Sequence, residues 1–377
     1  MPRWNVRHGI SARIALLAVL ATGLLLASCQ KTETIRLGFV GGLTGRNGDL
    51  GTAGRDGAIL AVETINENGG INGRKLELVI RDDKSDPAEA VNAVKDLVAG
   101  KVDAIVGPMT SVVAMATVPI IKDAKLLMLS PTVSTTELTG QDDHFIRLIE
   151  NRGIASAAAD QMAAKLGIRK AAVLYDISNR AFTETLVRGF RTRFTELGGA
   201  VIAERTFNGR ENVDFLALAR ELNSRRPQGL FIVAGALDSA MVCQQLKKLG
   251  SKSTIVISEW GGTSEFLKSG GRAAEGVYTL QHYNGDSTEP AFRSFRAAYE
   301  KRFGEPPIFA AAYSYEAVMM IAEALGRDPR PSRLKDTIVS IGTFTGLQGT
   351  FHIDRFGDPV RPFTVMRVEG GRFVTKE

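Results

Sequence analysis

The 377-residue chain carries a formal net charge of +6, and 44% of its residues are hydrophobic, which is ample material for packed cores. At this length two domains are favoured over one. Lys and Arg are interspersed with Asp and Glu along the chain, and this pattern excludes the concentrated basic face of a nucleic-acid-binding protein.

The N-terminus has the parts of an export signal. Arg3, Arg7 and Arg13 precede an apolar stretch at residues 14–26, which is too short for a permanent membrane-spanning helix. The Leu-Ala-Ser-Cys sequence that ends at Cys29 resembles a bacterial lipobox. It implies a signal peptide at residues 1–28, lipidation of Cys29 and a tether at residues 29–33. An ordinary N-terminal membrane anchor is the alternative.

Cleavage before Cys29 would remove three Arg and no acid, which lowers the net charge to +3. Cys243, the other cysteine, would then lack a disulfide partner. It lies in a helical stretch, where a buried small hydrophobe is expected in preference to a reactive thiol.

From residue 35 onward, short apolar runs alternate with longer segments of helical period, which predicts βαβ units and parallel sheets. In the first helix, Gly69 and Gly70 are expected to form the C-terminal cap. Asp86 is expected to cap the next helix, with Pro87 at its first position and Glu89 in its first turn. The first series of strands is predicted at residues 35–40, 75–80, 102–106 and 126–129, and the first helix at 51–68.

A second series repeats the alternation. Its strands are predicted at residues 170–175, 201–206, 229–233 and 254–257, with helices near 154–166, 181–197, 213–223 and 238–249. A run at 276–283 precedes helices near 289–303, 310–325 and 332–340, and strands at 349–354 and 363–368 close the chain.

Two polar loops follow predicted strands of the first series. Ligands of open parallel sheets bind at the carboxyl ends of the strands, so the loops at residues 106–111 and 130–135 are candidates. Hydroxyls, backbone N–H groups and a helix start at Ser111 suit a carboxylate. The alternative is that Ser111 and Ser134 only cap helices or close turns.

A third polar loop follows the strand predicted at residues 254–257. Glu259 is suited to pair with an ammonium group, or it is a solvated loop acid. Trp260 is either a packing residue or a wall of the same pocket.

No enzyme signature accompanies these loops. The chain after residue 28 has three histidines, His144, His282 and His352, without the spacing of known catalytic or metal-binding motifs. Phosphate-binding glycine motifs are also absent. The sequence therefore predicts no enzyme, no cofactor and no metal site.

Several segments resemble the branched-chain amino-acid-binding family of periplasmic solute receptors, and their order and spacing together are specific. The matching segments are residues 37–45, 68–78, 82–83, 86–87, 107–108, Ser111, 130–139, 346–351, Asp354 and 357–358.

The resemblance implies an α/β, type I periplasmic-binding fold. This fold has two doubly wound parallel-sheet lobes joined by three crossover strands. Lobe 1 is expected to comprise residues 34–148 and 280–348, and lobe 2 residues 149–279 and 349–377.

The resemblance also implies the site residues. Ser111, Thr132 and Ser134 would hold the carboxylate and part of the amino group of an amino acid, and Glu259 would meet its ammonium, beside Trp260.

This chain departs from the family around the solute's side chain. Where aromatic rings are common in the family, it has Leu50, Arg180 and Gly235 or Ala236. These departures predict a wider or more polar pocket than one built for leucine. Arg180 would favour a solute with an extra carboxylate, unless it is an exposed loop residue.

The expected function is capture of a small amino acid and its delivery to an inner-membrane ABC permease, with no nucleic-acid partner. The protein would be anchored through Cys29 in the inner or the outer membrane. The alternative is a periplasmic lipoprotein of the same fold that acts as a sensor or binds a partner, without transport.

Overall fold

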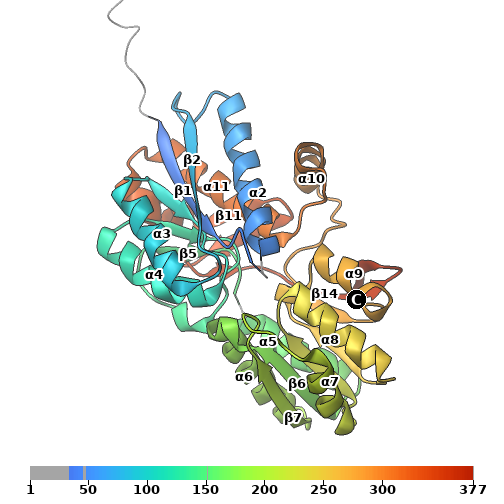
Figure 1. The fold of residues 1–377 in the computed structure, drawn as a ribbon. Helices are drawn as coiled ribbons and strands as arrows, with labels where there is room; N and C mark the ends of the chain where they lie inside the picture. The colour runs from blue at the N-terminus through green and yellow to red at the C-terminus, as the bar shows by residue number, and fades with distance from the viewer. Residues whose placement is uncertain (1–33, 46–47, 151, 377) are drawn as a thin grey trace, which may run out of the picture.

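The computed structural model describes residues 34–45, 48–150 and 152–376, which form two α/β lobes (Figure 1). The expected signal peptide, Cys29 and the tether lie outside the described residues. None of the helices in the described part of the chain combines the length and the hydropathy that crossing a membrane requires.

The sheet of the first lobe is entirely parallel, with strand order β2-β1-β3-β4-β5. Its strands are β1 (Ile35–Gly41), β2 (Leu76–Asp82), β3 (Ala104–Val106), β4 (Met128–Ser130) and β5 (Phe145–Arg147). The short β5 is absent from the strands expected from the sequence. The order reverses between β1 and β3, which is the arrangement of a doubly wound sheet.

Helices cover both faces of this sheet (Figure 1). Leu37 and Phe39 of β1 pack toward α2 and α11, whereas Val40 packs toward α3 and α4, because side chains alternate along a strand. The helices of this lobe are α2 (Gly48–Glu67), α3 (Pro87–Ala99), α4 (Ser111–Ala124), α10 (Pro290–Phe303), α11 (Phe309–Arg327) and α12 (Leu334–Ile341).

The second sheet repeats the same winding. Its order is β15-β14-β10-β9-β8-β6-β7, and β7, β6, β8, β9 and β10 are parallel while β14 and β15 are antiparallel additions. The strands are β6 (Lys170–Asp176), β7 (Ala200–Phe207), β8 (Gly229–Val233), β9 (Thr254–Ile257), β10 (Tyr278–Gln281), β14 (Thr364–Glu369) and β15 (Arg372–Lys376).

The helices of the second lobe also cover both faces of its sheet. Phe190 of α6 packs on Phe231 of β8, with ring centroids 4.6 Å apart, while α7, α8 and α9 pack on the opposite face. Cys243 is buried there, as expected. The helices are α5 (Arg152–Asp160), continued by a π-helical turn (Gln161–Lys165), α6 (Arg180–Glu196), α7 (Phe215–Ser224), α8 (Ala236–Lys248) and α9 (Ser264–Gly270).

The chain passes between the lobes after β5, after β10 and before β14. A small antiparallel sheet of β11 (Thr343–Gly346), β12 (Gly349–Ile353) and β13 (Pro359–Val360) precedes the third passage. Its residues Phe344 and Phe351 belong to the same apolar cluster as α11.

Two of the expected lobe boundaries fall inside elements of the structure. The division between residues 279 and 280 lies within β10, which pairs with β9 and β14 of the second sheet. The division between residues 348 and 349 lies within the hairpin of β11 and β12. The lobes therefore separate at the loops that flank these elements.

The expected helix caps are confirmed. The Asp86 carboxylate accepts hydrogen bonds from the backbone N–H groups of Ala88 and Glu89 at the start of α3. After α2, the Gly70 N–H donates to the carbonyl of Ile65, and both Gly69 and Gly70 have positive φ.

Helices α2 and α11 approach each other closely at Gly57. A Cβ atom at this position would lie 2.1 Å from the carbonyl oxygen of Ala311. We therefore expect Gly57→Ala to lower the free energy of unfolding by about 1–3 kcal/mol, the usual cost of overpacking. Chemical denaturation measures this change.

Gly326, near the end of α11, is the matched control, because a Cβ atom there would meet nothing within 4 Å. Gly326→Ala should be neutral or stabilise the protein by about 0.5–1 kcal/mol through its higher helix propensity. Equal stability changes in the two variants would contradict the close approach of the two helices.

Candidate functional site

A small cavity lies between the lobes, where the carboxyl ends of the parallel strands of both sheets meet. The first lobe contributes the loops after β3 and β4 and the first turns of α2 and α11, and the second contributes the loops after β6 and β9. The lining residues are Leu50, Met109, Thr110, Ser111, Thr132, Ser134, Ile149, Asn179, Phe182, Glu259, Trp260 and Phe309.

Six of the eight expected binding residues line this cavity: Leu50, Ser111, Thr132, Ser134, Glu259 and Trp260. Arg180 and Ala236 do not. The Arg180 side chain is 61% exposed and pairs with Glu184, because the first turn of α6 directs it to solvent. Ala236 is buried in the second lobe's core at the start of α8.

Hydroxyl groups hold the loops after β3 and β4 together. Ser130 donates to the carbonyl of Pro108 over 2.7 Å and accepts from the N–H of Val133. Thr132 donates to the carbonyl of Met109 over 2.6 Å. Since its proton is used in this way, Thr132 offers a solute only oxygen lone pairs, which suit an ammonium group.

Ser111, the first residue of α4, joins the two loops from the other side. Its oxygen accepts from the backbone N–H groups of Ser134 and Thr135, at 3.4 and 3.3 Å. These bonds use its lone pairs, so its proton can still be donated to a carboxylate. Ser111 therefore both organises the loop and presents a donor to the cavity.

Glu259 is the only charged residue among the described residues that line the cavity. Its carboxylate accepts from the backbone N–H of His282 at 2.9 Å and lies 3.0 Å from His282 Nδ1. Both side chains are nearly inaccessible to solvent, at 9% and 4% exposure. The backbone and the imidazole ring of His282 thus hold the Glu259 carboxylate at the wall of the cavity.

The remaining walls are mostly apolar. Trp260 meets Phe182 edge to face, with ring centroids 5.8 Å apart, and Leu50, Ile149 and Phe309 complete the surface. The space open to water centres is about 30 Å³, enough for about two water molecules. The cavity is small because these large side chains fill much of the space between the lobes.

Direct contacts between the lobes enclose the cavity. The Val112 N–H, in the first turn of α4, donates to Asn179 Oδ1 at 3.0 Å. Thr263 donates to the carboxylate of Asp49 at 3.2 Å, and Arg210 pairs with Asp86 at 3.2 Å. These contacts hold the lobes in a closed arrangement, and a solute larger than the cavity requires them to separate.

Sequence reasoning missed the lining residues Ile149, Asn179, Phe182 and Phe309, and it missed His282 behind Glu259. Asn179 follows the buried strand β6, so the rule that selected the other loops also applies to it. Phe182 and Phe309 have no polar group to distinguish them from core residues. His282 is 23 residues from Glu259, and no local signal relates the two.

Most of the chain matches a known protein family. A model of the periplasmic binding protein family matches residues 34–372. The chain belongs to this family. Its members are extracytoplasmic solute-binding components of transporters and not enzymes, and the type I periplasmic-binding fold expected from the sequence is confirmed.

Three relatives among periplasmic binding proteins illustrate the similarity. The leucine-, isoleucine-, valine-, threonine- and alanine-binding protein of Pseudomonas aeruginosa is 25% identical, over 94% of each chain. The crystal structures of leucine-binding LivK from Thermotoga maritima and of LivJ from Streptococcus pneumoniae with isoleucine are each 25% identical, with a TM-score of 0.83. They cover 91% of this chain and 98% and 100% of their own.

One buried acid of the first lobe has a strongly shifted pKa. Burial raises the pKa of Asp83, after β2, from 3.8 to about 7, against the effect of a hydrogen bond from the Ser85 N–H. The folded state therefore retains this proton better than the unfolded state does. The corresponding stability is present below pH 4 and is lost as the pH rises to about 7.

We expect Asp83→Asn to abolish the loss of stability at higher pH, because asparagine cannot ionise and still has an oxygen that accepts from the Ser85 N–H. At pH 8 the variant should be more stable than the wild type by up to about 4 kcal/mol, at about 1.4 kcal/mol for each pH unit between the two pKa values. At pH 4 the two should be equal. Urea denaturation across this range, with exposed Asp123→Asn as the control, measures the difference, and parallel pH profiles would contradict the prediction.

Proposed function

We propose that this protein is an extracytoplasmic lipoprotein that captures a small amino acid between its lobes and delivers it to an ABC permease of the inner membrane. The observation that carries the proposal is the distribution of polar groups in the cavity. One buried carboxylate, Glu259, is on the second lobe, and hydroxyl and N–H groups are on the first.

This arrangement suits a zwitterion. The ammonium group of an amino acid would neutralise Glu259 and donate to Thr132, and its carboxylate would accept from Ser111 and Ser134. A solute with only a negative charge would place it in a cavity whose single charged group is also negative, which is unfavourable. The names of the relatives, which bind leucine, isoleucine and valine, support the same class of solute.

The apolar walls support a short aliphatic side chain. Leu50, Phe182, Trp260 and Phe309 leave little space in the closed arrangement, so a compact solute requires the least separation of the lobes. Arg180, which would have favoured an extra carboxylate, is outside the cavity.

Capture would proceed by closure of the two lobes about a hinge, which the three passages between them would form. An amino acid would first bind the hydroxyl loops of one lobe, and closure would add Glu259 from the other. Only contacts that exist in the closed state favour closure, so the bond between solute and Glu259 would supply the differential free energy.

The binding test begins with calorimetry and Trp260 fluorescence on a panel of amino acids, dicarboxylates, amides and aromatic acids. Glu259→Gln and Ser134→Ala should each weaken binding of the best amino acid by roughly 10- to 100-fold, the value of one charge-assisted hydrogen bond. Arg180→Ala is the matched control and should leave the affinity unchanged.

Unchanged affinity in both Glu259→Gln and Ser134→Ala would remove the site assignment. A wild-type protein that binds no member of the panel, but captures a membrane protein other than a transporter, would favour the alternative role as a sensor or partner-binding module.

The anchor is tested separately. If lipid on Cys29 anchors the protein, Cys29→Ser should shift the exported protein from the membrane fraction to the soluble periplasmic fraction. Metabolic labelling with a palmitate analogue should be lost as well. Cys243→Ser, a substitution in the buried core, is the control for labelling. Continued labelling of Cys29→Ser would contradict the proposed anchor.

A further inference from the structure

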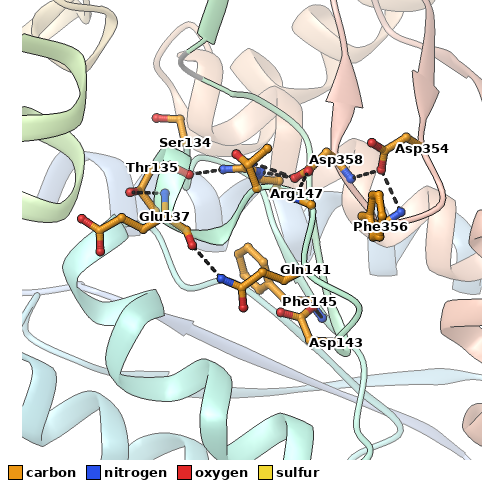
Figure 2. A network of polar contacts seen from close by, with 12 residues as sticks. Ser134, Thr135, Glu137, Gln141, Asp143, Phe145, Arg147, Asp354, Phe356 and Asp358 are labelled. Atoms are coloured by element: carbon orange, nitrogen blue, oxygen red, sulfur yellow. Dashed lines mark hydrogen bonds and ion pairs between the residues drawn. The ribbon is translucent and has the colours of Figure 1, made fainter. Parts of the chain in front are cut away.

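A buried ion pair lies behind the loop that carries Ser134. Arg147, the last residue of β5, has its Nη2 2.7 Å from Asp358 Oδ1, and its Nε donates to the same oxygen over 2.8 Å (Figure 2). The two side chains are 1% and 5% exposed. Neither belongs to the lining of the cavity.

The rest of the guanidinium group holds the site loop (Figure 2). Arg147 Nη1 donates to the carbonyl of Thr135, and Nη2 donates to Thr139 Oγ1 over 2.7 Å. The other Asp358 oxygen accepts from the Gly140 N–H over 2.7 Å. Both ends of the segment from Thr135 to Gly140 are therefore fixed by this one ion pair.

The held segment is connected directly to the cavity. The Thr135 N–H and the neighbouring Ser134 N–H both donate to Ser111 Oγ. Thr135 is therefore held at both of its backbone groups: its carbonyl accepts from Arg147, and its N–H donates to Ser111. A shift of Thr135 would therefore move both Ser134 and the Ser111 hydroxyl.

Asp358 is itself held in a tight turn. The carboxylate of Asp354 accepts from the N–H groups of Phe356 and Asp358, at 2.8 and 2.9 Å. Gly357 has φ +93° and its carbonyl accepts from the Arg147 N–H, and a Cβ atom there would lie 2.8 Å from the Phe145 carbonyl. The turn can approach β5 this closely only with glycine at this position.

The two residues of the ion pair also lie in sequence just before two of the three passages between the lobes. Arg147 directly precedes the passage that contains the cavity residue Ile149, and Asp358 is followed by β13 and the passage into β14. The loop that carries Ser134 and two of the passages between the lobes are thus all attached to the Arg147–Asp358 ion pair.

We propose that Arg147 and Asp358 are positioning residues that set the solute-binding geometry of Ser111 and Ser134 and attach this geometry to the hinge. The proposal rests on the solute-binding function proposed above. Its physical basis is that a buried ion pair contributes little net stability compared with apolar residues of similar volume, whereas its directional bonds define one loop position.

The test replaces the pair with apolar residues in the double variant Arg147→Met with Asp358→Leu. The matched control is Arg361→Met with Glu316→Leu, because Arg361 and Glu316 form a second buried ion pair, 2.6 Å apart, that also holds the third passage. Neither of these two residues lines the cavity or bonds the segment at residues 134–140.

Three measurements are made on each variant: the melting temperature, hydrogen exchange of residues 130–140 without solute, and affinity with dissociation rate for the best amino acid of the panel. The Arg147/Asp358 double variant should melt within a few degrees of the wild type. Its Ser134 and Thr135 amides should exchange at least 10-fold faster, and its affinity should fall roughly 10- to 100-fold, mainly through faster dissociation. The control pair should change neither exchange nor affinity.

Wild-type loop exchange and affinity in the Arg147/Asp358 double variant would overturn the proposal. Equal losses in both double variants would overturn it as well, since a general structural effect would then explain them. If the double variant does not fold, Arg147→Lys is measured in the same way. Lysine keeps the charge but carries its donors on one nitrogen, whereas arginine reaches Asp358, Thr135 and Thr139 from three. The loop should therefore again exchange faster and affinity should fall.

Failure of the proposed function gives a different pattern. A wild-type protein that binds no member of the panel would refute amino-acid capture. The exchange comparison without solute would still decide whether the ion pair fixes the Ser134 loop.

Discussion

The carboxyl ends of the parallel strands in both sheets face the same gap, and the position of every polar group of the site depends on this constraint. In a parallel sheet all the strands end at one edge, so loops that follow different strands are brought together there. The hydroxyl loops after β3 and β4 and the acidic loop after β9 can therefore meet only between the lobes. The result is a cavity whose described lining has one formally charged group, the carboxylate of Glu259.

Burying that charge is costly unless it is hydrogen-bonded, and His282 offsets the cost. His282 is the first residue after β10, where the chain leaves the second lobe. The contact that stabilises Glu259 therefore also connects the site to the hinge. Arg147 makes a comparable connection on the first lobe, through the loop of Ser134. The candidate site and the passages between the lobes are thus connected through hydrogen bonds of the same residues.

Much of the fold followed from local patterns. Apolar residues that recur at every second position, or with the period of a helix, predicted most strands and helices. Asp86 and Gly70 predicted two helix ends, and the structure contains the expected hydrogen bonds at both. The strands β5, β11, β13 and β15 were not predicted, because a run of two to five residues shows no clear period. The loops with Ser111, Ser134 and Glu259 were found because they follow buried strands.

The errors in the site have a common cause. Arg180 and Asn179 are adjacent, yet only Asn179 reaches the cavity, because successive residues at the start of a helix point in directions about 100° apart. The polarity of a loop does not indicate which of its residues faces inward. Phe182 and Phe309 escaped because a large apolar residue has the same appearance in a core as in the wall of a pocket.

The sequence by itself determined the α/β class, the two series of βαβ units and the polar loops that follow buried strands, because these depend on residue types within a few positions of one another. Only the tertiary structure decided that His282 would hold Glu259, that Asp358 would hold Arg147 and that Asn179 would close against α4. The partners in these pairs are 23 to 211 residues apart. Their contacts exist only because sheet winding and the docking of two lobes bring distant loops within hydrogen-bonding distance, and no local pattern specifies that distance.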